Sequence, residues 1–105
     1  MPTLSDLASV IRSKNAGPFQ VTIDIMFAVA EDYQRTLKSA RFTPAEIARR
    51  YRIDEAQVAL IPFERVHAIK ITIPRRWGSR GSGSIGDRDV YGAQQHGPLV
   101  NLKID

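Results

Sequence analysis

The sequence predicts an α+β domain in which an antiparallel four-stranded sheet carries helices on one face, preceded by an N-terminal helix. Residues 19–27 and 68–73 alternate apolar with mostly polar side chains, which is the period of two that half-buried strands show. Apolar residues before and between these segments recur at helical spacing. With 105 residues, of which 43% are hydrophobic, the chain fits a single domain, residues 1–105, with a modest core.

The first element expected is a short amphipathic helix. Thr3 and Asp6, three residues apart, form a capping-box start. The apolar positions keep the helical spacing: Leu4, Leu7, Ala8 and Ile11. We expect this helix to end before Gly17 and Pro18, and residues 19–27 to form the first strand.

Two helical segments follow this strand. Residues 30–40 form the first, with Tyr33 and Leu37 turned inward. In the second, Thr43 is the N-cap, Pro44 takes the first helical position and Glu46 the third. Residues 54–57 resemble one more helical turn.

A hairpin is expected next, from the apolar runs 58–63 and 68–73 and the connection 64–67. Pro62 cannot donate to a strand ladder, so its strand should lie at an edge of the sheet. His67, at the start of an apolar strand, is interpreted as a structural or turn residue.

The C-terminal part is expected to add a helix and a strand. Asp87 or Asp89 can cap a short helix through Gln95 that stops at Gly97 and Pro98, and residues 99–104 then form the last strand. After the first helix, the resulting order is that of ferredoxin-like folds, with the strands in spatial order 4-1-3-2. Six side chains of the two central strands should face the helices: Val21, Ile23, Ile25, Ile69, Ile71 and Ile73.

Composition excludes several classes of function. The chain has no cysteine, which rules out disulfides, thiolate catalysis and Cys-ligated zinc or iron–sulfur sites. No apolar run reaches the roughly 18 residues that cross a bilayer, and the start has no basic stretch followed by an apolar one. We therefore expect a soluble cytoplasmic protein that does not associate with a membrane. The net charge of +4 favours anionic partners weakly.

Six of the seven glycines fall within residues 78–97, a density typical of a shaped loop that approaches a ligand closely. Residues 81–86 match G-x-G-x-x-G. The pattern lacks the preceding strand, the following helix and the later acidic residue of a dinucleotide site, so no cofactor is expected. On a helix, His96 would lie about 10 Å or more from Asp87, and no metal site is expected from these two and Asp89. No catalytic residue can be assigned.

The sheet face away from the helices would carry Gln20, Thr22, Asp24 and Met26 on one central strand and Ala68, Lys70 and Thr72 on the other. RNA-recognition modules of similar topology stack bases on aromatic side chains there. No aromatic residue occupies these positions, and Asp24 would repel phosphate, so nucleic-acid binding is not favoured. The small and apolar side chains instead predict a homo-oligomer, with Asp24 and Lys70 able to pair across the strands.

An anion site is predicted at one end of the sheet. The first predicted strand starts, and the third ends, at this same end, and arginine suits carboxylates and phosphates. The candidate ligand-binding residues are Arg12, Ser13, Lys14, Asn15, Arg75, Arg76, Arg80, Asp87, Arg88, Asp89 and Tyr91. Asp87 and Asp89 oppose an anion unless they orient the arginines. The alternative interpretation is therefore a cluster of salt bridges with a purely structural role.

Residues 4–19 and 86–96 resemble a family of small bacterial proteins of unknown function, which occur beside or fused to acyclic-terpene-utilisation-type proteins. More distantly, the chain resembles the C-terminal ferredoxin-fold domain of those larger proteins, where R-S-G-D-K-G precedes the first strand. Residues 12–17 keep the Arg, the Ser and the final Gly, while the inner Gly-Asp-Lys is replaced.

This resemblance implies a small accessory subunit of such a larger protein, acting in the catabolism of branched or terpenoid acyl-CoA compounds or carboxylates, with a carboxylate or CoA-linked ligand. The alternative is a stand-alone oligomeric enzyme of small molecules. Whether the chain is itself an enzyme stays open.

Overall fold

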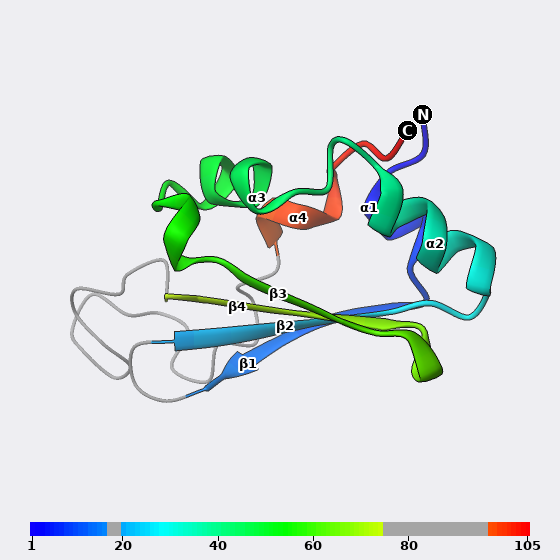
Figure 1. Ribbon diagram of the computed structural model, residues 1–105, viewed down its shortest axis with the longest axis horizontal. Helices are drawn as coiled ribbons and strands as arrows, with labels where there is room; N and C mark the ends of the chain where they lie inside the picture. Colours follow the sequence, from blue (N-terminus) through cyan, green and yellow to red (C-terminus); the bar gives the residue numbers. More distant parts are fainter. Residues whose placement is uncertain (17–19, 75–96) are drawn as a thin grey trace.

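The computed structural model describes residues 1–16, 20–74 and 97–105. In these residues one antiparallel sheet has the strand order β1-β2-β4-β3, and the α-helices lie on one of its faces (Figure 1). The strands are β1 (Val10–Asn15), β2 (Gln20–Met26), β3 (Ala59–Phe63) and β4 (Ala68–Pro74). The helices are α1 (Leu4–Leu7), α2 (Ala30–Lys38), α3 (Pro44–Tyr51) and α4 (Gly97–Val100), with 3-10 turns η1 (Glu55–Gln57) and η2 (Glu64–Val66). The α+β class, with helices on one face, is confirmed.

Local chemistry explains where the helices begin. Thr3 and Asp6 form the expected capping box at α1, in which each side chain accepts the other's backbone N–H. At α3, Thr43 Oγ1 accepts the N–H of Glu46 at 3.2 Å, and Pro44 occupies the first turn. Glu46 also accepts hydrogen bonds from Arg49 and Arg50, which lowers the pKa of its carboxyl. The arginine-rich segment thus stabilises its own helix.

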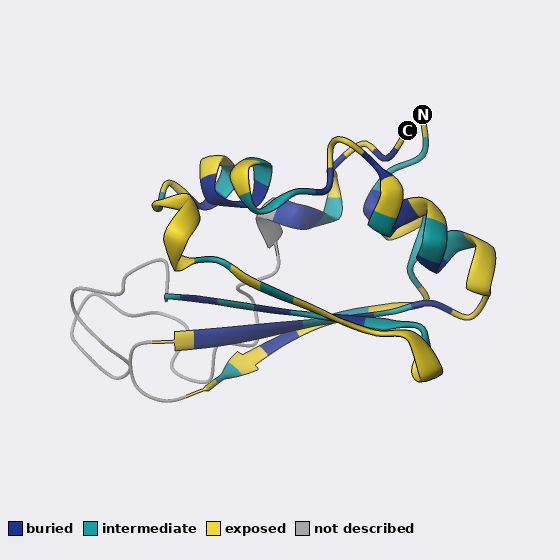
Figure 2. Ribbon diagram, in the orientation of Figure 1, coloured by how far each residue is buried: buried dark blue, intermediate teal, exposed yellow. Residues whose placement is uncertain are grey.

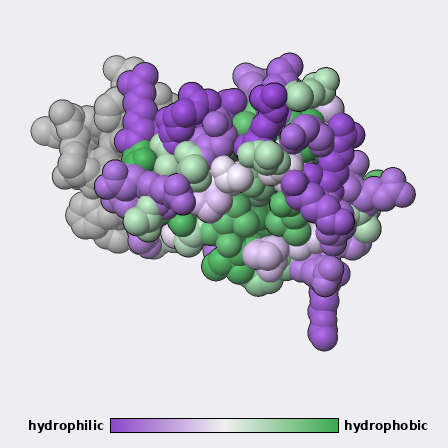
Figure 3. All heavy atoms as spheres, turned by 45° about the horizontal axis from the view of Figure 1, so that its top comes forward, coloured by the Kyte–Doolittle hydropathy of each residue, from purple (hydrophilic) through white to green (hydrophobic). Residues whose placement is uncertain are grey.

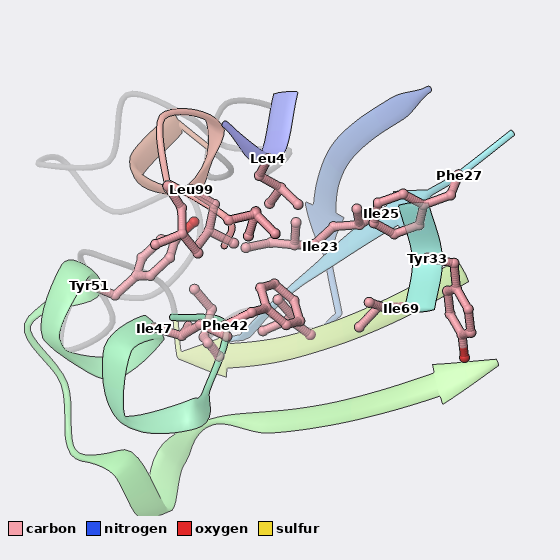
Figure 4. Close-up of a cluster of buried hydrophobic side chains, with 14 of the residues drawn as sticks. Leu4, Ile23, Ile25, Phe27, Tyr33, Phe42, Ile47, Tyr51, Ile69 and Leu99 are labelled. Atoms are coloured by element: carbon pink, nitrogen blue, oxygen red, sulfur yellow. The ribbon is translucent and has the colours of Figure 1, made fainter. Parts of the chain in front are cut away.

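The core lies between the sheet and the helices. All six side chains expected to face the helices are at most 1% exposed: Val21, Ile23, Ile25, Ile69, Ile71 and Ile73. They pack with residues of the helical layer such as Leu4, Tyr33, Phe42, Ile47 and Leu99 (Figure 4). Burial is concentrated in β2, β4 and the inner sides of the helices (Figure 2). Seen from the helical side, the surface is mostly hydrophilic, with hydrophobic side chains gathered in one central area (Figure 3).

The first helix is much shorter than predicted, because the chain turns extended at Ala8 and continues as β1. This strand pairs with β2 in the register Val10↔Met26 to Asn15↔Val21. Ile11, assigned to the helix from its spacing, instead lies opposite Ile25 in the sheet. Two consecutive β-branched residues, Val10 and Ile11, favour the extended backbone over a helix.

Residues 99–104 do not form the predicted fourth strand. They belong partly to α4, and Thr3 and Lys103 form an isolated antiparallel bridge that holds the two ends of the chain together. The sheet position beside β2, predicted for this segment, is filled by β1. A connection of only residues 16–19 separates β1 from β2, so closing this hairpin costs less chain entropy than recruiting the C-terminal segment. The helix expected between Asp87 and Gln95 lies outside the described residues.

Strand β3 lies at the opposite edge of the sheet, as Pro62 predicts. His67 follows η2 with a left-handed backbone (φ 50°), and its carbonyl accepts the N–H of Phe27 at 2.9 Å. Its ring lies 5.7 Å from that of Tyr33, whose pKa is raised by burial and by the charge of Glu64. His67 is therefore a turn residue that supports the core.

Asp105 fastens the C-terminal segment to α2. Its carboxylate accepts a hydrogen bond from the Ser39 hydroxyl, and its main-chain oxygen accepts one from Arg35 Nε at 3.0 Å. The Ser39 hydrogen bond is the main cause of a lowered Asp105 pKa, with smaller contributions from Arg41 and Arg35. A carboxyl whose pKa falls on folding stabilises the folded state at pH values above its ordinary pKa of 3.8. This stabilisation is lost as the pH falls through the folded-state pKa.

We therefore expect Asp105→Asn to be less stable than the wild type at neutral pH, because the amide lacks the charge that Ser39, Arg41 and Arg35 favour. Urea unfolding of both proteins from pH 7 downward measures the effect. The difference should shrink as the pH falls below 3.8. A difference that stays constant with pH contradicts this account.

Candidate functional site

Three strand termini meet at one end of the sheet. Asn15, at the end of β1, lies opposite Val21, and Gln20, at the start of β2, lies opposite Pro74, at the end of β4. The prediction that the first central strand starts where the other ends is therefore confirmed. Arg75 and Arg76 follow Pro74 directly in the chain. Seven candidate residues lie outside the described part: Arg75, Arg76, Arg80, Asp87, Arg88, Asp89 and Tyr91.

The other four candidates lie within β1 rather than before the first strand of the sheet. Because side chains alternate along a strand, they divide between its two faces. Arg12 and Lys14 lie on the face away from the helices, whereas Ser13 and Asn15 lie on the face toward them, where Ser13 is buried. The structure thus brings Arg12 and Lys14 onto one surface and separates them from the other two.

We call this surface the open face; it consists of the sheet side chains on the side away from the helices. Cross-strand partners arrange it in rows: Lys14, Thr22, Thr72 and Ala59 form one, and Arg12, Asp24, Lys70 and Ile61 form the next. Directly opposite side chains have Cβ atoms about 5 Å apart, so each row is a set of neighbours. The two rows carry three cations and one carboxylate.

Asp24 forms a salt bridge with Arg12, with 3.8 Å between Arg12 Nε and Asp24 Oδ2. The Arg12 side chain is 64% exposed, whereas that of Asp24 is 23% exposed. Lys70 lies directly across from Asp24 on the other side, but the salt bridge of Asp24 is formed with Arg12 and not with Lys70 as predicted. Water screens such an exposed pair, so its contribution to stability is small. Its main effect is to orient Arg12 while leaving the guanidinium accessible.

Thr22 is the unusual member of this face. It is the third residue of β2, flanked by Lys14 and Thr72, yet it is only 4% exposed. Within the described residues, its Oγ1 is the buried side-chain polar atom that has no hydrogen-bond partner. Nearly all buried hydroxyls in proteins are hydrogen-bonded, so such an atom requires an explanation.

The model of a family described as a domain of unknown function, DUF4387, matches residues 4–103. The chain belongs to the DUF4387 family. No curated protein and no solved structure matches it. The expected link to acyclic-terpene-utilisation-type proteins is not part of the family description and stays a prediction.

The described part of this DUF4387 chain offers neither a cluster of metal ligands nor a membrane-spanning helix. The part of the chain that the structure describes holds no group of three or more His, Asp or Glu side chains able to hold a metal ion. Asp87, Asp89 and His96 lie outside that part. None of the described helices is long and apolar enough to cross a membrane.

Sequence reasoning placed Thr22 on the open face of the DUF4387 domain but gave it only a role in oligomer contacts. Its sequence signal is a hydroxyl at an alternating position between Val21 and Ile23, which any half-exposed strand can show. Its burial and its missing partner depend on the neighbouring strands. These two properties therefore appear only in the structure.

Proposed function

We propose that this DUF4387 domain is a small accessory subunit that binds an acidic ligand, a carboxylate or a CoA-linked compound, for a larger acyclic-terpene-utilisation-type protein. The pathway and the partner are supported by the resemblance of residues 4–19 and 86–96. The ligand class is supported by one observation above all: Arg12 and Lys14 share the open face, and Lys14 lies near the end of the sheet at which β4 leads into Arg75 and Arg76.

Arg12 has the chemistry that this function needs. Its planar fork of N–H donors matches the two oxygens of a carboxylate, and Asp24 limits its freedom before a ligand arrives. The high exposure of its side chain leaves donors available. Lys14 and Lys70 add positive charge on the same face, which outweighs the charge of Asp24 in these two rows of the described sheet.

We also propose that the domain assembles with a second copy through the end of the open face that lies away from Lys14 and Thr22. Met26 and Ala68 lie opposite each other and are half-buried, and three large apolar residues extend the surface: Val10 is 43%, Ile61 45% and Phe63 46% exposed. Covering such side chains stabilises an assembly. Light scattering at high micromolar concentration tests this proposal, and a purely monomeric protein contradicts it.

Binding of a short branched carboxylate tests the ligand class. Arg12→Ala and Arg88→Ala should each weaken binding about tenfold or more without unfolding the domain, because each removes a charge-assisted contact. Arg65→Ala is the matched control, since Arg65 is exposed in η2 at the other end of the sheet. Unchanged affinity in both test variants contradicts the placement of the site.

Co-expression with an acyclic-terpene-utilisation-type protein tests the accessory role. The two chains should purify together, and activity should require both. Activity of the isolated chain would instead favour the alternative of a stand-alone oligomeric enzyme.

A further inference from the structure

We propose that Thr22 anchors the oxyanion of a ligand, a carboxylate or a phosphate group, on the open face of the sheet, with Lys14 supplying the opposing charge. This inference rests on the proposed function for the acidic nature of the ligand and names the atoms that hold it. The anchor lies on β2, next to the row that carries Arg12 and Asp24.

The first step is the unpaired hydroxyl. Thr36 is as deeply buried as Thr22, and its Oγ1 donates to the carbonyl of Asp32 at 2.9 Å. Thr22 Oγ1 has no such bond. A valine has nearly the same shape, suits a central strand at least as well and leaves no buried polar atom unpaired. Packing alone therefore does not account for a hydroxyl at this position, whereas a ligand that accepts its hydrogen bond does.

The second step is the charge around that hydroxyl. Its cross-strand neighbours on the open face are Lys14 and Thr72, and the next row adds Arg12 and Lys70. The carboxylate of that row, Asp24, is already paired with Arg12. A hydroxyl can donate or accept, but in a positive surrounding it serves best as a donor to an anion. This balance selects an oxyanion over a metal cation.

The third step is access. The Thr22 hydroxyl is covered in this structure, so a ligand reaches it only when the atoms that cover it move aside. Lys14 is exposed and has a flexible four-carbon stem, which lets its ammonium group move without disturbing the strand. The Thr22 hydroxyl would then gain the hydrogen bond that it lacks. Ligand binding would therefore also provide the buried hydroxyl of Thr22 with its hydrogen-bond partner.

Backbone amide NMR of the full chain, titrated with inorganic phosphate and separately with isovalerate, tests the site. Saturable shifts are expected at residues 14, 22 and 72 with at least one of the two anions, and their comparison shows whether phosphate or carboxylate is preferred. Thr22→Val should weaken binding about tenfold, the effect of losing one hydrogen bond to a charged group, while Thr22→Ser retains it. Lys14→Gln should weaken binding by a similar factor.

Two controls separate this site from a general effect of charge or folding. Lys38→Gln makes the same charge change on α2, on the other side of the sheet, and should leave the affinity unchanged. Thr22→Val should also raise the midpoint of urea unfolding, because it removes the unpaired hydroxyl. A loss of binding in a more stable protein cannot be attributed to misfolding.

The outcomes distinguish the anchor from the proposed function. Wild-type affinity in Thr22→Val overturns the anchor, and if Arg12→Ala still loses binding, the proposed acidic ligand stands. The absence of any saturable shift overturns both the anchor and the acidic ligand. An equal loss of anion affinity in Lys38→Gln and Lys14→Gln overturns the local site, because it indicates nonspecific electrostatic attraction.

Discussion

Replacing Ile71 by alanine is expected to lower the free energy of unfolding by about 2–5 kcal/mol. Ile71 is fully buried on the central strand β4, directly opposite Ile23 on β2, and its side chain lies between the sheet and the helices. Truncation removes buried methyl groups and leaves a cavity that two paired central strands cannot readily close. Urea unfolding followed by circular dichroism measures the loss.

Ile61→Ala, measured at a protein concentration at which the domain is monomeric, is the matched control, because it makes the same chemical change on the neighbouring strand β3. Ile61 is 45% exposed on the open face, so its truncation should cost less than about 1 kcal/mol. Equal losses in the two variants would show that the open face is as buried in solution as the core. In the monomer, that result would contradict the arrangement of the sheet.

The central strands were predictable because their pattern has one simple explanation. Residues 21–25 and 69–73 place β-branched apolar side chains at every second position, and only a strand with one buried face accommodates this period. Pro62 located the edge strand, since a missing N–H is tolerated only where part of the ladder is unpaired. Each of these signals is local to the strand that carries it.

The outer strand on the other side was not predictable, because local patterns report burial rather than pairing partners. Ile11 fits the apolar face of a helix that starts at Thr3 as well as it fits a strand opposite Ile25. Residues 99–104 are apolar enough for a strand, and Leu99, Leu102 and Ile104 are indeed buried. They pack in the core without pairing beside β2, so their predicted place in the sheet was wrong.

For the candidate site, too, local patterns were readable from the sequence whereas the neighbours of each residue were not. The sequence identifies Arg12 and Lys14 as cations near a strand end, and alternation places Thr22 on the open face. Only the register shows that Lys14 lies beside Thr22 and Arg12 beside Asp24. A missing hydrogen bond is a property of everything around an atom, so no local pattern can indicate the Thr22 hydroxyl.

Replacing Ile104 by alanine is expected to lower the free energy of unfolding by about 2–5 kcal/mol, although the residue lies outside the sheet. Its side chain is fully buried in the core, and its N–H donates to the carbonyl of Pro2 at 2.8 Å. The C-terminal segment therefore closes the core above the sheet and holds the N-terminal segment in place.

Lys103→Ala serves as the control for Ile104→Ala, because Lys103 is exposed and its bridge to Thr3 uses only the backbone. It should change stability by no more than about 0.5 kcal/mol, and both variants are measured by urea unfolding. A small loss in Ile104→Ala would mean that the end of the chain frays in solution. The core would then be closed by the sheet and the remaining helices alone, and Asp105 would have no fixed partner in Ser39.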